Sequence, residues 1–442
     1  MPTAANSLEQ LLADAAWAAG PAVSVAVRRG PGARTGTATV SCGPATVFQA
    51  ASISKPVAAL GTLILVDRGT LNLDDDVNDH LTSWRLPVPA GWPARVTLRH
   101  LLCHGGALSV DAFPGYLRGT DLPSLRQILD GEPPANTPPV RVSGLPGLSH
   151  RYSGGGYTVL QQLLEDVTGT AFSELMAELV LRPLGMSGAH YSPPGPDEGA
   201  PGYIKDEQVP GGWHVYPEQA AAGLWCTPSD LVNFAGAIQD MAAGRAREPG
   251  QPWPLGTATA RLMLAGQFPG WGLGLQLGGA GAGRRFGHTG GNEGYACEVS
   301  ATVAPGPVIA IMTASHDGHQ LISRLGPPLR QHLAWPDQEA LEAGPEPDQR
   351  VSFAVLAGQV GRHAGDYTTG AGQVLRVAGH DWNWTLTAPG QPPLPLEPVT
   401  PDTLRSPVLP AELTFTEQAG RMVLTLRQPG DDGTEEIIAT RV

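Results

Sequence analysis

Lysine is nearly absent from this chain, since Lys55 and Lys205 are the two lysines among 28 basic residues. The net charge is −13, and Lys and Arg form no run anywhere along the chain. Nucleic acids and anionic membranes attract basic patches, so neither is expected as a partner. A small neutral or zwitterionic substrate fits this composition better. Arginine cannot release its proton inside a protein, so a lysine kept among arginines is a candidate for proton transfer.

Long apolar runs and paired cysteines are missing as well. The longest apolar run, Val57 to Val66, is much shorter than a membrane span. The first 20 residues do not have a basic start followed by an apolar stretch, so no signal peptide is indicated and a cytoplasmic location is expected. The four cysteines lie far apart, which suggests neither a zinc site nor a disulfide framework: Cys42, Cys103, Cys226 and Cys297.

The length and composition predict two domains. A chain of 442 residues with 41% hydrophobic residues can bury a large core, and its 57 glycines and 43 prolines are scattered as turn signals. Residues 336–350 are acidic and contain proline, which indicates a linker. The predicted domains are an α/β domain over 1–340 and a small all-β domain over 351–442.

Hydrophobic periodicity places the elements of the first domain. A hairpin is expected from strands at 22–27 and 37–42, followed by a helix that begins at Ser52 and stops before Gly69. Helices are predicted at 98–102, 157–168, 172–181 and 228–241, and strands at 271–277, 296–303 and 308–313. Both ends of this region would then form one sheet, with an inserted helical region between them.

The residue pattern changes after Arg350. Short alternating runs at 374–377, 382–386, 413–415, 422–426 and 436–440 are separated by Gly, Pro and Asp. This pattern predicts a small antiparallel barrel or sandwich.

Two motifs carry residues suited to covalent catalysis. In Ser52-Ile53-Ser54-Lys55, residues three apart share one helical face, so the Lys55 amine can reach the Ser52 hydroxyl near a helix N-terminus. In Tyr152-Ser153-Gly154, a tyrosine stands on a glycine-rich loop ahead of a helix, where it could exchange a proton with Lys55. A tyrosine that only packs on a loop is the alternative.

A third motif, Gly287-His288-Thr289-Gly290-Gly291, enters a predicted strand. Its small residues would let a substrate backbone lie along the strand edge, and the Gly291 amide could form an oxyanion hole with that of Ser52. His288 would line the pocket, although a histidine in such a turn is often structural.

In this order, the three motifs resemble those of class C β-lactamases, D-alanyl-D-alanine carboxypeptidases, D-aminopeptidases and family VIII carboxylesterases. Three further segments are similar to the same family: VTLRHLLCHGGAL, RPLGMSGAHY and AAAGLWCTPSDLVNF. The resemblance covers about residues 8–335. It implies a β-lactamase/transpeptidase-like α/β sheet flanked by helices, and the tail after Arg350 loosely resembles a lipocalin-like barrel, which in relatives shapes the active-site mouth or an oligomer interface.

The resemblance also implies roles for individual residues. Ser52 would be the acylating nucleophile, Lys55 and Tyr152 the proton-transfer pair, and the amides of Ser52 and Gly291 the oxyanion hole. His288, Thr289, Gly290 and Gly154 would contact substrate, and no metal or organic cofactor is implied.

Departures from the family pattern bear on the substrate. Gly154 stands where β-lactamases and carboxypeptidases have an asparagine that holds the substrate acylamide, and His288 replaces the lysine usual in β-lactamases. Arg284 and Arg285 could compensate in the capture of a carboxylate. His104-Gly105-Gly106 replaces the usual His-Thr-Ser-Gly.

We therefore expect a serine hydrolase that acts through an acyl-enzyme on short peptides or amino-acid amides. A carboxylesterase acting on small esters is the main alternative, followed by a β-lactamase or a non-catalytic penicillin-binding-like protein. Homo-oligomerisation remains open.

Overall fold

The computed structural model describes residues 7–15, 20–195, 198–247, 252–336, 360–380, 383–400, 402–430 and 433–442. Apart from Pro336, the expected linker lies outside these residues. The chain forms two compact units. The first consists of residues 1–73, 112–138 and 157–341, and the second of residues 74–111, 139–156 and 342–442. Two segments from the middle of the chain thus belong with the C-terminal region.

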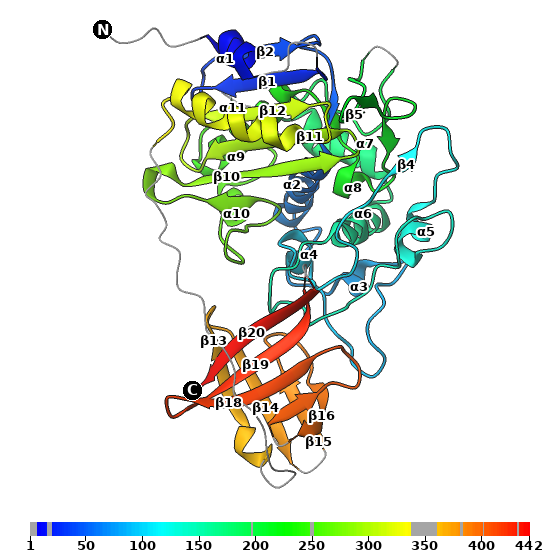
Figure 1. Ribbon diagram of the computed structural model, residues 1–442, viewed down its shortest axis with the longest axis vertical. Helices are drawn as coiled ribbons and strands as arrows, with labels where there is room; N and C mark the ends of the chain where they lie inside the picture. The colour runs from blue at the N-terminus through cyan, green and yellow to red at the C-terminus, as the bar shows by residue number, and fades with distance from the viewer. Residues whose placement is uncertain are drawn as a thin grey trace. The chain divides into compact units, whose positions relative to one another are not determined.

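A six-stranded sheet forms the centre of the first unit (Figure 1), and its order is β2-β1-β12-β11-β10-β9. The strands are β1 (Val23–Arg28), β2 (Gly36–Val40), β9 (Gln276–Gly278), β10 (Arg285–Asn292), β11 (Tyr295–Thr302) and β12 (Val308–Thr313). All the pairs are antiparallel, and β1 lies between its hairpin partner β2 and the distant β12. The predicted sheet built from both ends of this region is confirmed.

Helices cover both faces of this sheet. On one face, α1 (Leu8–Ala15) and α11 (Gly318–His332) bury leucines such as Leu12 and Leu325 against Val25 and Ile311 of the strands. On the other face lie α2 (Ser54–Asp67) and α9 (Pro228–Ala242), as Figure 1 shows. Because β12 is covered on both sides, all six of its residues are buried and it reads as a continuous apolar run.

The first unit contains further helices, turns and two-residue strands. Its helices are α5 (Leu125–Asp130), α6 (Gly154–Thr168), α7 (Phe172–Met176), the π-helical turn η2 (Ala177–Leu181), α8 (Gln219–Ala222) and α10 (Thr257–Met263), with 3-10 turns η1 (Ala51–Ile53) and η3 (Gly281–Gly283). The first three residues of α6 belong to the second unit. Two-residue strands pair as β3 (Phe48–Gln49) with β8 (Trp225–Cys226), β4 (Tyr116–Leu117) with β7 (His214–Val215), and β5 (Tyr203–Ile204) with β6 (Glu207–Gln208).

The strand predicted at 271–277 is wrong over most of its length. Only its last two residues enter β9 (Gln276–Gly278). Gly270 and Gly274 have φ values of +75° and +81°, which turn the backbone out of an extended conformation. The apolar residues between them are therefore part of a turn.

The second unit contains a closed eight-stranded antiparallel barrel, so the predicted C-terminal barrel is confirmed. Its strands are β13 (Gly365–Thr369), β14 (Val374–His380), β15 (Asn383–Thr387), β16 (Leu394–Thr400), β17 (Thr403–Arg405), β18 (Glu412–Gln418), β19 (Arg421–Gly430) and β20 (Gly433–Arg441), preceded by η4 (Val360–His363). β20 pairs with β13 and closes the ring. Large side chains such as Tyr367, Trp384 and Phe415 are buried and fill the interior.

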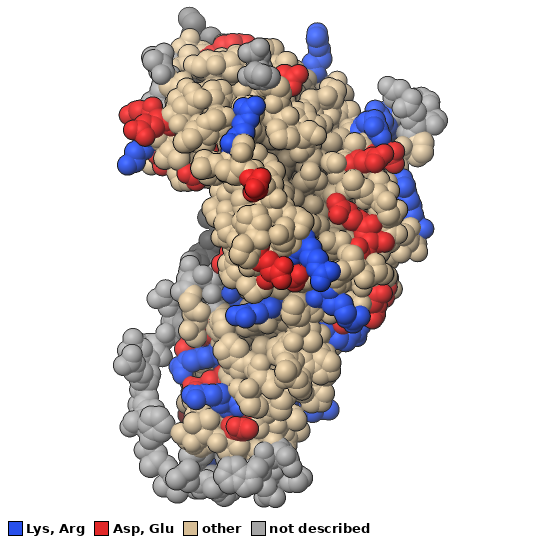
Figure 2. All heavy atoms as spheres, turned by 90° about the vertical axis from the view of Figure 1, so that its right-hand side faces the viewer, with Lys and Arg blue, Asp and Glu red and all other residues tan. Residues whose placement is uncertain are grey.

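The same unit includes α3 (Val77–His80) and α4 (Leu98–Leu102). Within the described residues, no helix has both the length and the apolar character needed to cross a membrane. On the face drawn in Figure 2, acidic and basic side chains are interspersed among uncharged residues.

Candidate active site

Ser52 lies in a buried turn between β3 and α2. The turn is tight because Ala51 has a φ of +47° and the Ile53 amide donates to the Ala50 carbonyl at 2.9 Å. The Ser54 hydroxyl donates to the Ala51 carbonyl at 2.6 Å and accepts from the Leu224 amide at 3.0 Å. Ser54 thus ties the turn to the segment that follows α8, a positioning role that the motif spacing alone does not reveal.

Lys55 is the second residue of α2, and its amine is directed at the Ser52 hydroxyl. Lys55 Nζ lies 3.0 Å from Ser52 Oγ and also donates to the Ala221 carbonyl of α8 at 2.9 Å. The residue is 2% exposed, and burial lowers the pKa of its ammonium group from 10.5 to about 7. A large share of Lys55 is therefore neutral at physiological pH, when its nitrogen can accept a proton.

Strand β10 lies against the Ser52 turn. A Cβ atom added to Gly290 would lie 2.5 Å from the Ala50 carbonyl oxygen and 3.2 Å from the Ala51 Cβ. Only glycine therefore allows this close approach. Gly291, the next residue, is exposed at the strand end, while Thr289 is half-buried.

His288 of the same strand is 2% exposed, and its imidazole contacts the Trp271 ring edge to face at 5.7 Å between centroids. Burial, reinforced by the charge of Lys55, lowers the pKa of His288 to about 3. His288 is consequently neutral at physiological pH and offers no positive charge to a substrate carboxylate.

Asn292 joins three elements around the site. Its side-chain amide donates to Gln49 Oε1 of β3 at 2.7 Å and to the Ala222 carbonyl of α8 at 3.1 Å. Asn292 therefore holds β10 to the strand before the nucleophile turn and to the helix whose Ala221 carbonyl binds Lys55. Asn292 directly follows the third motif, but the sequence gives no sign of these two partners.

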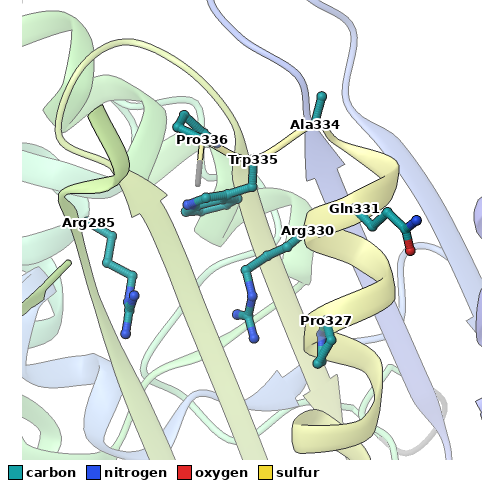
Figure 3. Close-up of a pocket in the computed structure, with 7 residues that line it drawn as sticks. All are labelled: Arg285, Pro327, Arg330, Gln331, Ala334, Trp335 and Pro336. Carbon is teal, nitrogen blue, oxygen red and sulfur yellow. The ribbon is translucent and has the colours of Figure 1, made fainter. Parts of the chain in front are cut away.

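The two candidate arginines make other contacts. Arg284 donates to the Leu264 carbonyl at 3.0 Å. Arg285 lies three residues before His288 on β10, so their side chains point to opposite faces of the sheet. Arg285 lines a hollow of about 570 Å³ with Arg330 and Trp335 (Figure 3), and the charge of Glu298 interacts with both guanidinium groups.

Tyr152 and Gly154 belong to the second unit, where Tyr152 packs on His104. Their rings are stacked with centroids 4.2 Å apart. The His104 carbonyl accepts from the Arg151 amide at 2.7 Å, and His104 Nδ1 accepts from the Ser153 amide at 3.1 Å. His104 therefore holds Tyr152 through its ring and through both neighbouring residues, a role that sequence reasoning missed.

The loop continues into α6, where the buried Gly154 amide donates to the Asp111 carbonyl at 2.8 Å. Further along this helix, in the first unit, the ring centroid of Tyr157 lies 6.0 Å from Lys55 Nζ. Among the described residues, no three His, Cys, Asp or Glu side chains gather as a metal site.

Comparison with known proteins is consistent with this geometry. The Beta-lactamase family model matches residues 8–325. Penicillin-binding protein 4 of Amycolatopsis lactamdurans is 26% identical over 342 residues, which cover 72% of this chain and 85% of that protein. Esterase EstB of Burkholderia gladioli is 35% identical over 156 residues, or 32% of this chain and 37% of the esterase.

Solved structures show a similar fold. The crystal structure of SurE with D-Leu matches with a TM-score of 0.58 and 23% identity, covering 98% of this chain and 97% of SurE. The family match spans the Ser52 turn, Lys55, the Tyr152 loop and strand β10. The chain therefore belongs to the beta-lactamase family of serine hydrolases.

Proposed function

We propose that this protein hydrolyses short peptides or amino-acid amides through a covalent acyl-enzyme on Ser52. The observation that carries the proposal is the Lys55 amine, which is buried, has a pKa of about 7 and lies 3.0 Å from Ser52 Oγ. A serine hydroxyl is a weak nucleophile until a neighbouring base accepts its proton. A neutral lysine at hydrogen-bonding distance is such a base.

Acylation begins when Ser52 Oγ attacks the substrate carbonyl carbon and its proton moves to Lys55 Nζ. The backbone amides of Ser52 and Gly291 would donate to the resulting oxyanion. The close packing of Gly290 on the Ala50 carbonyl supports the pairing of these two amides, because Gly290 directly precedes Gly291 and lies against the nucleophile turn.

Breakdown of the tetrahedral intermediate breaks the bond from carbon to the leaving nitrogen, which takes up a proton. Tyr152 would pass that proton on from Lys55. In support, Tyr152 lies five residues before Tyr157, whose ring is 6.0 Å from Lys55 Nζ. Water then attacks the acyl-enzyme, gives its proton to the same pair, and Ser52 regains its hydroxyl proton as the acid leaves.

The substrate class follows from what surrounds the third motif. His288 is buried and neutral, so a substrate would not depend on a carboxylate held at this position. This favours amides and short peptides with uncharged groups here over β-lactams, and SurE, a structural relative, has been crystallised with D-Leu. Thr289 and Gly290 would pair with the substrate backbone along β10, and Gly154 would leave room where a larger side chain would stand.

A carboxylesterase is the second candidate. It is supported by the similarity to Esterase EstB and by Gly154, whose lack of a side-chain amide removes a contact specific to acylamides. Esters and amides share every step above except the protonation of the leaving group, since an alkoxide or phenoxide leaves more readily than an amine anion.

A panel of chromogenic substrates tests the proposal. We would compare D- and L-alanine p-nitroanilide, p-nitrophenyl acetate and butyrate, and nitrocefin, each with wild type and with Ser52→Ala. Anilide turnover that disappears in Ser52→Ala is the expected result. Turnover of the esters alone would favour the carboxylesterase, and turnover of none would contradict hydrolysis of these classes.

A further inference from the structure

The barrel binds the loop that carries Tyr152, and both belong to the second unit. Gln428 of β19 is 3% exposed and makes three hydrogen bonds. Its Oε1 accepts from the Leu145 amide at 3.1 Å, and its Nε2 donates to Ser149 Oγ at 3.2 Å and to Glu435 Oε2 at 3.1 Å. This single glutamine thus spans the loop at two points four residues apart.

Two more barrel residues hold the same stretch. Ser149 Oγ donates to Glu435 Oε2 of β20 at 2.8 Å, and Gln373 Nε2 donates to the Gly147 carbonyl at 2.6 Å. A Cβ atom added to Gly144 would lie 3.3 Å from Gln428 Oε1, so a glycine lets the loop approach closely. These contacts involve Leu145, Gly147 and Ser149, which all lie within seven residues of Tyr152 in the sequence.

The His104 segment also binds this loop. The Gly147 amide donates to the Gly105 carbonyl and the Arg151 amide to the His104 carbonyl, both at 2.7 Å. The sequence Gly144-Leu-Pro-Gly147 has no helix or strand of its own. Fixing such a segment costs backbone entropy, which the contacts with the barrel and with the His104 segment offset.

We propose that the barrel positions the Tyr152 loop for proton transfer, with Gln428 as the central positioning residue. The proposal rests on the proposed function, in which Tyr152 passes a proton. Loss of the Gln428 contacts would leave only the Glu435 and Gln373 hydrogen bonds described above between the barrel and the loop, so Tyr152 would spend less time in its productive position. A barrel that only stabilises the chain would not act on turnover in this way.

The chain offers a matched control in Gln391. It is 7% exposed, its Oε1 accepts from the Arg95 amide at 3.0 Å, and its Nε2 donates to the Arg95 carbonyl at 2.8 Å. The neighbouring residue Pro392 is bound as well, since the indole nitrogen of Trp92 donates to its carbonyl at 2.9 Å. Gln391 therefore joins the barrel to Arg95, which belongs to another segment of the second unit than the Tyr152 loop, through hydrogen bonds of the same kind.

The experiment compares Gln428→Leu with Gln391→Leu in the full chain. Both leucines keep the side-chain volume nearly constant and remove the hydrogen bonds, so both variants should unfold at lower denaturant concentration than wild type. We expect Gln428→Leu to lower kcat about tenfold or more with KM within about twofold, and Gln391→Leu to leave kcat within about twofold of wild type. Gln373→Leu, which removes the Gly147 contact, replaces Gln428→Leu if the latter fails to fold.

A double-mutant cycle shows whether the effect passes through Tyr152. In a Tyr152→Phe background, Gln428→Leu should lower kcat by less than about twofold, because the group that it positions is already gone. Equal losses of kcat in Gln428→Leu and Gln391→Leu, or an undiminished effect in the Tyr152→Phe background, would overturn the proposal.

Amide hydrogen exchange separates this inference from the proposed function. Exchange in residues 143–153 should be faster in Gln428→Leu than in Gln391→Leu, whether or not a substrate is turned over. A wild type without Ser52-dependent activity would defeat the proposed function, while unchanged exchange in this loop would defeat the positioning role by itself.

Discussion

The rings of His104 and Tyr152 are stacked with an interplanar angle of 30°. His104 has a φ of +58°, a conformation rare for residues with a side chain, and this turn aims both its ring and its carbonyl at the Tyr152 loop. The backbone conformation at position 104 therefore helps to determine where the Tyr152 hydroxyl lies.

Substitution of His104 can separate the hydrogen bond from the ring contact. Asparagine tolerates a positive φ, and its side-chain oxygen can accept from the Ser153 amide in place of Nδ1, whereas alanine can do neither well. We expect His104→Asn to keep more kcat than His104→Ala, with the alanine variant also losing about 1–2 kcal/mol of unfolding free energy. Equal kcat values in the two variants would contradict a role for the hydrogen bond that His104 Nδ1 accepts from the Ser153 amide.

Lys55→Arg should lower kcat/KM at least about 10³-fold although it preserves a positive charge. Arginine does not give up its proton below about pH 12, so it cannot act as the base for Ser52. Steady-state kinetics on the best substrate of the panel measure the effect, with Lys205→Arg as the control at an exposed lysine. Retention of most activity in Lys55→Arg would refute the role of Lys55 as proton acceptor.

The pH dependence of kcat/KM should report the titration of Lys55. The neutral amine is the active form, so kcat/KM is expected to rise about tenfold per pH unit below 7 and to level off above it, in line with the lowered pKa of about 7. Initial rates from pH 5 to 9 measure this profile. A flat profile over this range, or one that still rises about tenfold per pH unit at pH 9, would contradict a depressed pKa for Lys55.

Lys55→Met should abolish activity but stabilise the protein. The folded state lowers the pKa of Lys55 from 10.5 to about 7. Between these values the unfolded chain binds one more proton than the folded chain, so the stability of wild type rises with pH in this window and is reduced most below pH 7. A tenfold change in proton affinity corresponds to about 1.4 kcal/mol, and the hydrogen bonds to Ser52 and Ala221 offset part of the total, so we expect a gain of about 1–3 kcal/mol at pH 7.

Denaturant unfolding at several pH values measures this gain. The difference between Lys55→Met and wild type should shrink as the pH rises from 7 toward 10. A variant less stable than wild type at pH 6 would show that the hydrogen bonds of Lys55 outweigh the cost of burying its charge.

Gly290→Ala should damage both stability and activity. The new methyl group would lie 2.5 Å from the Ala50 carbonyl oxygen and 2.6 Å from Cys297 Sγ, so β10 and the Ser52 turn must move apart. We expect a loss of about 1–3 kcal/mol in unfolding free energy and a marked fall in kcat. Gly30→Ala is the control, because nothing lies within 4 Å of its added Cβ.

The sequence predicted the Ser52–Lys55 pair because residues three apart share a face in any helical geometry. The strands β1, β2, β11 and β12 also followed from apolar or alternating runs. The strand expected from Trp271 was wrong because glycine conformation, not hydrophobicity, determines the backbone path there. Propensity does not report which glycine adopts a positive φ.

Contacts between distant segments were beyond sequence reasoning. Three contacts join residues that are far apart in the chain: the ring stack of His104 and Tyr152, the hydrogen bond from Asn292 to Gln49, and the hydrogen bond from the Leu145 amide to Gln428. Such residues are polar and individually ordinary, so no local pattern distinguishes them. A glutamine at an inward-facing position of a predicted strand indicates a polar partner, but it does not identify that partner.

The sheet register has a consequence for how the chain is made. Val23 of β1 pairs with Thr313 of β12, so the first sheet strand to leave the ribosome finds one of its two neighbours only near the end of synthesis of the first unit. Pairing over such long sequence separations is slow and leaves strand edges open in the meantime. The edge of β1 that faces β12 therefore stays unpaired until residues 308–313 have been made, and an open strand edge favours pairing with other chains.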